Sequence, residues 1–385
     1  MEIHEVCFPR ALQMFLDDVG WFYGRDERSR NMPSRTGLPR RHVPADYAAI
    51  HELGKAIGQR VGVAFVIGDW DRNRVLARVP MSNWLGENWN GSEYFVQEEA
   101  EKIRDYVNAS EFIDISLHGL EHDCWLNGEN IGGREFFIPE GMKKGGKAVL
   151  APESQVRQHL DAFFEIYRTW QFNKPIRNFV SPGAIGGAKN YDGMTKILHE
   201  YGIRTWCNGL KTDVVKEHSF VSNGVIFNKK TFMLAPWEAY DLNPDTYPMF
   251  DPEKVGILYG HWPNILRYDP ERNLEGLDAW KRLYDRQCEV FGILRSRDIE
   301  FAHCQQIYRN YGKIEKQGDA VVLDMTDADA IMPADMARPF YISVRHGGGA
   351  LRCEGADCTL YERKKEFDTY CIDRKGSASP VKLYR

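Results

Sequence analysis

The stretch ALQMFLDDVG, residues 11–20, sets the pattern from which the fold is predicted. Its apolar first part predicts a short buried strand, which ends at the paired carboxylates of Asp17 and Asp18. Later apolar runs also end beside ionisable residues, namely Asp69, His118, His261 and His303. In parallel α/β proteins the carboxyl ends of the strands meet at one face, where active sites are assembled. We therefore expect these side chains to lie near one another.

Helix-period segments alternate with the apolar runs. The clearest ones are Tyr47–Gln59, Glu98–Val107, Glu153–Trp170, Tyr191–Tyr201 and Leu274–Arg295. Alternation of buried strands and helices predicts parallel βα units and an α/β fold. Seven or eight such units favour a closed or nearly closed barrel, although periodicity alone leaves an open sheet as an alternative. Ile299–Ala302 is included as a strand that ends at His303.

The pattern changes from about Tyr311. The rest of the chain holds short strand-like runs and no predicted helix; the runs are Gly318–Leu323, Phe340–Val344, Ala350–Cys353 and Cys358–Tyr361. We predict two domains, a barrel over residues 1–310 and a small all-β domain, a sandwich or sheet, over residues 311–385. The second domain is expected to contact carbohydrate or, as an equal alternative, to serve packing or homo-oligomer formation.

Composition narrows the classes of function. Hydrophobic residues make up 43% and charged residues 27% of the 385 residues, as in ordinary globular proteins, and the net charge is −5. Nucleic-acid binding is not expected, because the one dense basic stretch, Arg25–Arg41, is interrupted by Pro33, Gly37 and Pro39 and is interpreted as a surface loop. No apolar run reaches the ~18 residues of a membrane helix, so no membrane partner is expected.

Cysteine usage and the amino terminus indicate the compartment. The eight cysteines include no CxxC pair, and their spacing does not resemble a disulfide framework. The first residues, Met-Glu-Ile-His-Glu, lack a basic region followed by an apolar run, so no signal peptide is predicted. We expect a cytoplasmic protein, with a trimmed precursor as the alternative.

The strongest chemical pattern combines Asp17-Asp18 with the segment HGLEH, residues 118–122. His118 and His122, four residues apart and placed at the start of a helical turn, would reach one cation together. Asp18 from a neighbouring strand end would complete a three-residue metal site and leave positions open for water and substrate. Asp17 would take a proton from that water. The alternatives to a metal site are that the HxxxH spacing arises by chance and that the Asp pair caps a helix.

These segments resemble motifs of the polysaccharide deacetylase family (carbohydrate esterase family four, NodB-like). Phe15–Gly20 is similar to its first motif, Thr-Phe-Asp-Asp-Gly, and His118–His122 is similar to its second, His-(Ser/Thr)-x-x-His. Val180–Gly183 resembles its third motif, Arg-x-Pro-Tyr-Gly, and Ile257–His261 resembles its fifth, an apolar strand that ends in Leu-x-His. The resemblance spans roughly residues 10 to 305.

The resemblance implies a distorted (β/α)7 barrel that carries a metal-dependent deacetylase site. Asp18, His118 and His122 would be the metal ligands, Asp17 the general base and His261 the general acid. The expected ion is Zn²⁺, with Co, Ni, Fe or Mn as alternatives for mixed nitrogen and oxygen ligands. The substrate would be a carbohydrate or a small acylated molecule.

Three departures from the family pattern stand out. Gly119 replaces the small hydroxyl residue of the second motif, and Val180 stands where the third motif has its Arg. Arg177 is the nearest arginine before Pro182. The fourth motif has no clean match, and Trp206–Asn208 or Trp237–Asp241 would occupy its place.

Candidate substrate-binding tryptophans lie in or beside predicted strand-to-helix loops, with Trp21 next to the proposed base and Trp262 next to the proposed acid. Tryptophan faces stack on sugar rings, and the alternative for each is to plug the mouth of the barrel. The chosen residues are Trp21, Asp69, Pro182, Trp237 and Trp262.

Two other functions remain open from the sequence. One is a glycosidase or another hydrolase on a related barrel, in which Asp17 or Asp18 attacks carbon. The other is a carbohydrate-binding protein without turnover.

Overall fold

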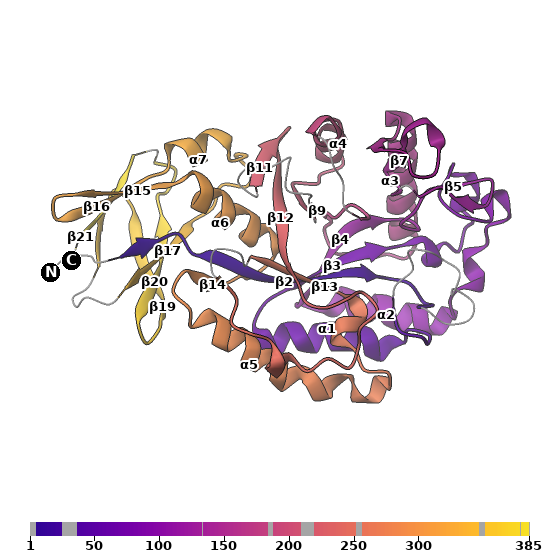
Figure 1. Ribbon diagram of the computed structural model, residues 1–385, viewed down its shortest axis with the longest axis horizontal. Helices are drawn as coiled ribbons and strands as arrows, with labels where there is room; N and C mark the ends of the chain where they lie inside the picture. Colours follow the sequence, from indigo (N-terminus) through magenta and orange to yellow (C-terminus); the bar gives the residue numbers. More distant parts are fainter. Residues whose placement is uncertain are drawn as a thin grey trace.

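A computed structural model describes residues 5–24, 37–132, 134–183, 188–208, 219–251, 256–345, 351–377 and 379–384 of the chain. Most of the basic stretch predicted as a surface loop, residues 25–36, lies outside the described residues. Figure 1 shows a row of strands through the middle of the molecule, with α1 and α5 below them and α3 and α4 above. The carboxyl-terminal sheets lie at one end of the molecule.

Seven parallel strands form the centre of the fold. In chain order they are β2 (Arg10–Val19), β3 (Val61–Val66), β4 (Ile113–Gly119), β9 (Asn178–Phe179), β10 (Thr205–Asn208), β12 (Val225–Met233) and β13 (Ile257–His261). Each strand pairs in parallel with the next one in this order. The last strand, β13, pairs in parallel with the first, β2, so the seven strands form a ring. Parallel pairing brings all seven carboxyl ends to one face.

Five α-helices accompany these strands: α1 (Pro44–Ile57), α2 (Gln97–Ala109), α3 (Glu153–Thr169), α4 (Ala188–Glu200) and α5 (Leu277–Cys288). The buried residues of α3 show why such a segment folds as a surface helix, since Val156, Leu160, Phe163 and Tyr167 recur at the spacing of one helix face. The predicted α/β class is confirmed. Strict alternation is not found, because among the described residues no α-helix lies between β10 and β12 or between β12 and β13.

Several short strands lie outside the ring of seven parallel strands. The segment between β4 and α3 holds two small hairpins, β5 (Trp125–Leu126) with β6 (Glu129–Asn130) and β7 (Phe137–Pro139) with β8 (Ala148–Leu150). Elsewhere, β11 (Ser219–Ser222) runs antiparallel to β12, and β14 (Ile293–Arg295) runs parallel to the start of β2. The segment that contains these two hairpins supplies several groups to the candidate site described below.

The apolar group inside the ring includes a residue from outside it. Side chains from five strand regions pack with Ile299, the first residue of α6 (Ile299–Tyr311). These side chains are Phe15, Ala64, Val180, Cys207 and Ile257. The predicted strand Ile299–Ala302 is therefore wrong. Asp298 caps the helix by accepting a hydrogen bond from the backbone N–H of Phe301 at 2.8 Å, which starts a helix where the apolar run resembles a strand. His303 lies within α6, fully buried, and not at a strand end.

The carboxyl-terminal part contains two four-stranded antiparallel sheets. One joins β15 (Lys313–Gln317), β16 (Ala320–Asp324), β21 (Val381–Tyr384) and β18 (Arg352–Glu354); the other joins β1 (Val6–Cys7), β17 (Phe340–Arg345), β20 (Phe367–Asp373) and β19 (Asp357–Arg363). Leu323 and Leu383 from the first sheet share one apolar cluster with Ile342 and Ile372 from the second. The prediction that this part lacks helices is wrong, because α7 (Thr326–Ile331) follows β16.

The first described strand of the chain, β1, belongs to this region. β1 runs antiparallel to β17, with Val6 opposite Val344 and Cys7 opposite Ser343. Figure 1 places both termini beside these sheets. The predicted division at residues 310 and 311 falls within the last turn of α6, and it stays a prediction.

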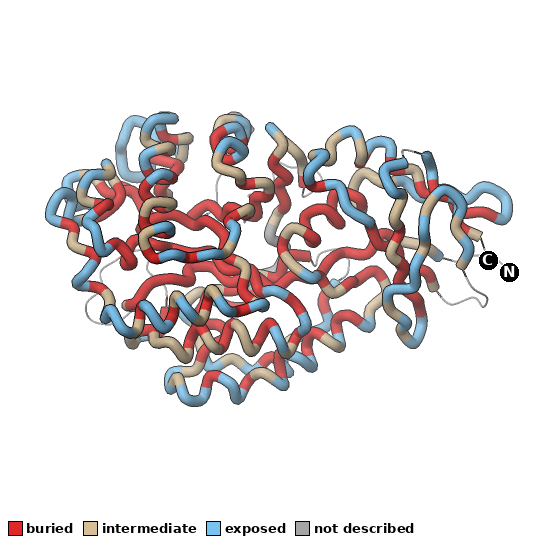
Figure 2. Tube along the Cα trace, turned by 180° about the vertical axis from the view of Figure 1, so that it is seen from behind, coloured by how far each residue is buried: buried red, intermediate tan, exposed pale blue. Residues whose placement is uncertain are grey.

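Burial follows this arrangement. Figure 2 shows buried residues running continuously through the central strands and along the inner sides of the helices. All eight cysteines carry free thiols, and four of them, Cys124, Cys207, Cys288 and Cys304, are buried. Within the described ranges, no helix combines the length and the apolar character that a membrane span requires.

Candidate metal centre

The end of β2 presents two adjacent carboxylates at the carboxyl face of the ring. Asp17 is 8% exposed and Asp18 is 2% exposed. The chain leaves the strand through Asp18, with φ of 64°, and Gly20, with φ of 128°. A Cβ atom on Gly20 would come within 2.2 Å of the carbonyl oxygen of Val66, so glycine allows the turn to pack against the end of β3. Asp17 and Asp18 thus lie at the end of β2, directly before a tightly packed turn.

Asp18, His118 and His122 converge as the sequence predicts. One candidate ligand atom from each residue lies within 4.8 Å of the others, and all three residues are buried. Asp18 Oδ1 is 2.9 Å from His118 Nε2 and 3.7 Å from His122 Nε2. One carboxylate oxygen and two imidazole nitrogens form a donor set that suits a divalent transition-metal ion. The residues present therefore fit the predicted metal.

The strand next to β4 fixes the orientation of His118. Its Nδ1 atom lies 2.7 Å from the backbone carbonyl oxygen of Val180, which can only accept a hydrogen bond. Nδ1 therefore carries a proton, and Nε2 is the ring nitrogen on the side of Asp18, where a metal ion would take the place of the proton that Nε2 donates to Oδ1. This is the arrangement that a metal-binding histidine requires.

The predicted helical turn between His118 and His122 is wrong. His118 lies in β4, and the chain then bends with positive φ at Gly119 (120°) and His122 (69°). Buried Glu135 holds the bend, since its carboxylate accepts hydrogen bonds from the backbone N–H groups of Leu120 and His122. A Cβ atom on Gly119 would come within 2.2 Å of Glu135 Oε2. Glycine in the second motif therefore makes room for this carboxylate.

Glu135 also contacts a histidine of α3, His159. His159 Nδ1 lies 3.2 Å from Glu135 Oε1, and both side chains are almost fully buried. His159 Nε2 lies 2.8 Å from the carbonyl oxygen of Pro80. The sequence predicts a role in the site for neither Glu135 nor His159. Neither residue lies in a recognisable local motif.

The ionisation of Asp18 and His122 reflects their mutual contact. Burial alone would raise the pKa of Asp18, but the hydrogen bond from His118 and the charges of His122 and His261 hold that pKa well below its usual range. Burial alone would lower the pKa of His122, but the carboxylates of Asp123 and Asp18 raise that pKa above its usual value. Asp18 is thus ionised and able to bind a cation.

Asp17 and His261, the predicted proton-transfer residues, lie beside this group on adjoining strands. They are register partners in the parallel pairing of β2 with β13. His261 Nε2 lies 3.9 Å from Asp18 Oδ2, and its side chain is 17% exposed. The structure thus brings His261 to the three predicted ligands and places Asp17 next to Asp18 in β2, opposite His261.

The predicted substrate-binding residues are placed less uniformly. Trp21 is buried with its ring centroid 6.2 Å from that of His122, and Trp262 is buried with ring centroids 4.0 Å from His42 and 4.8 Å from Tyr47. Both therefore pack in the protein and offer no open face for a sugar ring. Trp237 is half-buried.

Asp69 and Pro182 complete the predicted substrate-binding set. Asp69 is fully buried, and its Oδ2 accepts a hydrogen bond from the backbone N–H of Phe22 at 2.9 Å. Its carboxylate thus holds the chain that follows β2. Pro182 is buried beside Gly183, in the turn after β9.

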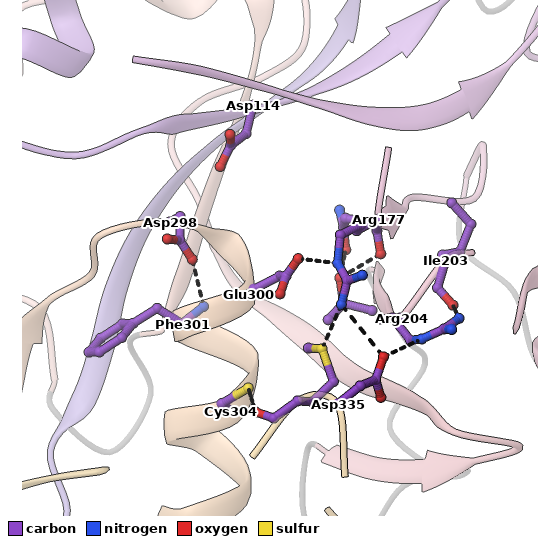
Figure 3. Close-up of polar contacts among 12 residues, drawn as sticks. Asp114, Arg177, Ile203, Arg204, Asp298, Glu300, Phe301, Cys304 and Asp335 are labelled. Atoms are coloured by element: carbon purple, nitrogen blue, oxygen red, sulfur yellow. Dashed lines mark hydrogen bonds and ion pairs between the residues drawn. The ribbon is translucent and has the colours of Figure 1, made fainter. Parts of the chain in front are cut away.

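Arg177 points away from this site. Figure 3 shows its guanidinium directed toward Glu300 and Asp335, and Nε lies 2.5 Å from Glu300 Oε1. These residues lie at the amino end of the strands, where Arg177 also lines a cavity of about 170 Å³ together with Asp114. Arg177 therefore does not replace the arginine of the third motif.

Comparison with known proteins does not assign the chain to a family. No family model and no curated protein matches it. A protein assigned as a polysaccharide deacetylase from Mycobacterium smegmatis shows 12% identity and a TM-score of 0.40, over 74% of this chain and 86% of that one. The 4-alpha-glucanotransferase from Thermococcus litoralis shows 12% identity and a TM-score of 0.35, over 75% and 39%. Xylanase C from Talaromyces cellulolyticus (its GH30 catalytic domain) shows 8% identity and a TM-score of 0.29, over 97% and 98%.

These similarities are too low to support an argument about fold or activity. The class of protein that the chain itself defines is a mixed α/β protein with a buried Asp-His-His group at the carboxyl ends of its parallel strands. Any more specific function has to be argued from its own residues.

Proposed function

We propose that this protein is a metal-dependent hydrolase that removes an acyl group from an amide or ester on a carbohydrate. The observation that carries the proposal is the convergence of Asp18, His118 and His122, with Asp17 and His261 on the two adjoining strands. The proposal includes a distorted (β/α)7 barrel in residues 1–310 as the catalytic unit and an accessory role for residues 311–385. Zn²⁺ is the proposed ion.

The three ligands would hold the ion, and the other groups would handle protons. A bound divalent ion supplies Lewis-acid polarisation and makes a nearby water easier to deprotonate. Asp17 accepts the proton of the attacking water, because its carboxylate sits next to the ligand Asp18 on the same strand end. His261 donates a proton to the departing amine or alkoxide from the neighbouring strand. Nearly complete burial of Asp18 and His118 keeps bulk water from competing for their ligand atoms.

The contacts of Asp18 weigh against the glycosidase alternative. A retaining glycosidase uses one carboxylate as a nucleophile and a second as an acid on the other side of the bond. Asp18 Oδ1 faces two imidazoles at 2.9 and 3.7 Å, which suits a metal ligand better than an attacking group. Asp17 and Asp18 also leave adjacent positions of one strand.

Metal analysis of the purified protein tests the proposal. The wild type is expected to hold stoichiometric Zn²⁺ after loading and dialysis, whereas His118→Ala and Asp18→Asn are expected to lose it. His51→Ala is the matched control, because this histidine bonds to Ser110 Oγ away from the site. A wild-type protein that holds no ion under any loading condition would contradict the proposal. Acetate release from acetylated sugars then tests the reaction class.

A further inference from the structure

The carboxylate that follows His122 lies behind the imidazole of this ligand. Asp123 is 1% exposed, and its Oδ1 lies 3.7 Å from His122 Nδ1. Its Oδ2 accepts a hydrogen bond from Asn130 Nδ2 at 2.8 Å, in the first small hairpin after β4. On the other side of the ring, His122 Nε2 faces Asp18. The imidazole thus lies between two carboxylates, one of which belongs to the proposed metal site.

A buried carboxylate requires a compensating charge, and Arg134 supplies it. Arg134 Nη1 lies 3.3 Å from Asp123 Oδ1, the same oxygen that faces His122. The position of Arg134 is fixed by reciprocal backbone hydrogen bonds with Phe137, where the second small hairpin begins. The side chain of Arg134 is 38% exposed, so it reaches Asp123 from the solvent side. An ion pair at a buried carboxylate lowers the energetic cost of its burial.

The third-motif turn makes room for this arginine. Gly183 has φ of 65°, and a Cβ atom there would come within 2.2 Å of Arg134 Nε and 2.5 Å of its Cδ. The side chain of Arg134 therefore lies directly against the backbone of Gly183. Val180 stands in this same segment where the family pattern has an arginine. An arginine thus does approach the third-motif turn, but it comes from the segment between β4 and α3.

We infer that Asp123 and Arg134 are positioning residues that orient His122 as a metal ligand. Asp123 favours a proton on Nδ1, which leaves the lone pair of Nε2 directed toward Asp18 and the ion. Arg134 holds Asp123 in place through the 3.3 Å contact of its Nη1 with Oδ1. The inference rests on the proposed metal-dependent function and adds two residues to it. Neither residue needs to touch the substrate.

Zinc affinity measured by competition with a chromogenic chelator tests the inference. Asp123→Ala is expected to weaken Zn²⁺ binding by about 10- to 100-fold, as for other residues that support a metal-binding histidine. Arg134→Gln is expected to weaken it less, and Arg134→Lys is expected to restore part of the loss. Because the two residues act as one unit, the double variant is expected to bind Zn²⁺ about as weakly as Asp123→Ala alone.

Arg157→Gln provides the matched control. Arg157 is exposed to a similar degree, 30% against 38% for Arg134, and forms ion pairs with Glu153 and Glu200 away from the site. Its loss is expected to leave Zn²⁺ affinity unchanged. Thermal unfolding of the metal-free proteins checks that each variant folds. If Asp123→Ala does not fold, Arg134→Gln decides the outcome, because its side chain lies partly in solvent.

The possible failures are distinguishable. A wild type that binds no Zn²⁺ would overturn both the proposed function and this inference. A wild type that binds Zn²⁺, together with folded Asp123 and Arg134 variants of equal affinity, would overturn this inference alone and leave the proposed function standing.

Discussion

His261 in β13 lies directly opposite Asp17 in β2 in the parallel register of the two strands. The pairing fixes the distance between their backbones, so the two proposed proton-transfer residues are held beside Asp18 by the sheet and not by mobile loops. A site built on paired strands is positioned more accurately than one built on loops. Substitution of either side chain should therefore affect chemistry more than folding.

The first prediction concerns Asp17. Asp17→Asn keeps the shape of the side chain but cannot accept a proton, so turnover is expected to fall by about 10²- to 10⁴-fold. Zn²⁺ content is expected to stay at the wild-type level, because Asp18 and the two histidines are unchanged. Turnover of an acetylated sugar and metal analysis on the same preparation check this. Loss of the ion together with activity would assign Asp17 to the ligands instead.

The second prediction concerns Gly119. An alanine there would push against Glu135 and strain a backbone with φ of 120°, so Gly119→Ala is expected to cost at least about 2 kcal/mol of stability and to weaken Zn²⁺ binding. Gly141→Ala is the control, since Gly141 also has positive φ but a Cβ atom there would meet nothing within 4 Å. The control is expected to cost about 1 kcal/mol. Urea unfolding of both variants separates the cost of the clash with Glu135 from the cost of the backbone strain. Equal losses of unfolding free energy in the two variants would argue against the role given to Glu135.

The third prediction concerns buried Asn264, which ties the end of β13 to the preceding loop. It accepts a hydrogen bond from the backbone N–H of His261 at 2.9 Å and donates to the carbonyl oxygens of Pro236 and Ala239. Asn264→Ala is expected to cost about 2–3 kcal/mol and to lower turnover, because three partly buried backbone groups lose their side-chain partner. Asn108→Ala, which removes similar backbone contacts at the surface, is expected to cost less. Equal unfolding free energies for the two variants would contradict this.

The fourth prediction concerns Asp114 at the amino end of the strands. Burial raises its pKa to about 6, with Asp298 and Glu300 adding to the rise and Arg60 and Lys174 opposing it. Because the folded state holds this proton more tightly than the unfolded state does, the proton stabilises the fold at low pH. That stabilisation is lost as the pH rises from about 4 to about 6.

Asp114→Asn removes this titration. The free energy of unfolding of the wild type minus that of Asp114→Asn is expected to fall by about 2 kcal/mol across that pH range and to stay constant above about pH 7. Urea unfolding at a series of pH values measures the difference. A difference that rises with pH, or that does not change, would contradict the assignment.

Long amphipathic helices and buried strands could be predicted from the sequence, since their spacing is repeated over many residues. The predicted helix Glu153–Trp170 agrees with α3 to within a residue, and the predicted strand Phe112–Leu117 lies within β4 plus one residue. Leu274–Arg295 was too long for one helix. It contains α5 and β14, and the chain turns between them at Gly292, with φ of 87°.

The candidate site was predictable where it follows strand ends or a recognisable spacing, as for His122 in the segment HGLEH. Asp18 and His118 come directly from strand ends, whereas Arg134 and Glu135 lie between the two small hairpins, in a segment with no periodic pattern. Trp262 shows the opposite error, because a tryptophan next to a proposed acid suggested a sugar-binding face and the structure packs it against His42 and Tyr47. Contacts between distant segments decide such cases, and a single sequence does not contain them.

The pairing of β1 with β17 has a consequence for how the protein is made. A ribosome releases Val6 and Cys7 early, but their strand partners, Val344 and Ser343, emerge only near the end of synthesis. Contacts between segments so far apart in the sequence form slowly, because a long loop must close first. The ring of parallel strands can therefore assemble on the ribosome while β1 still lacks its strand partner. The sheet that contains β1 is completed only after β17 has been translated.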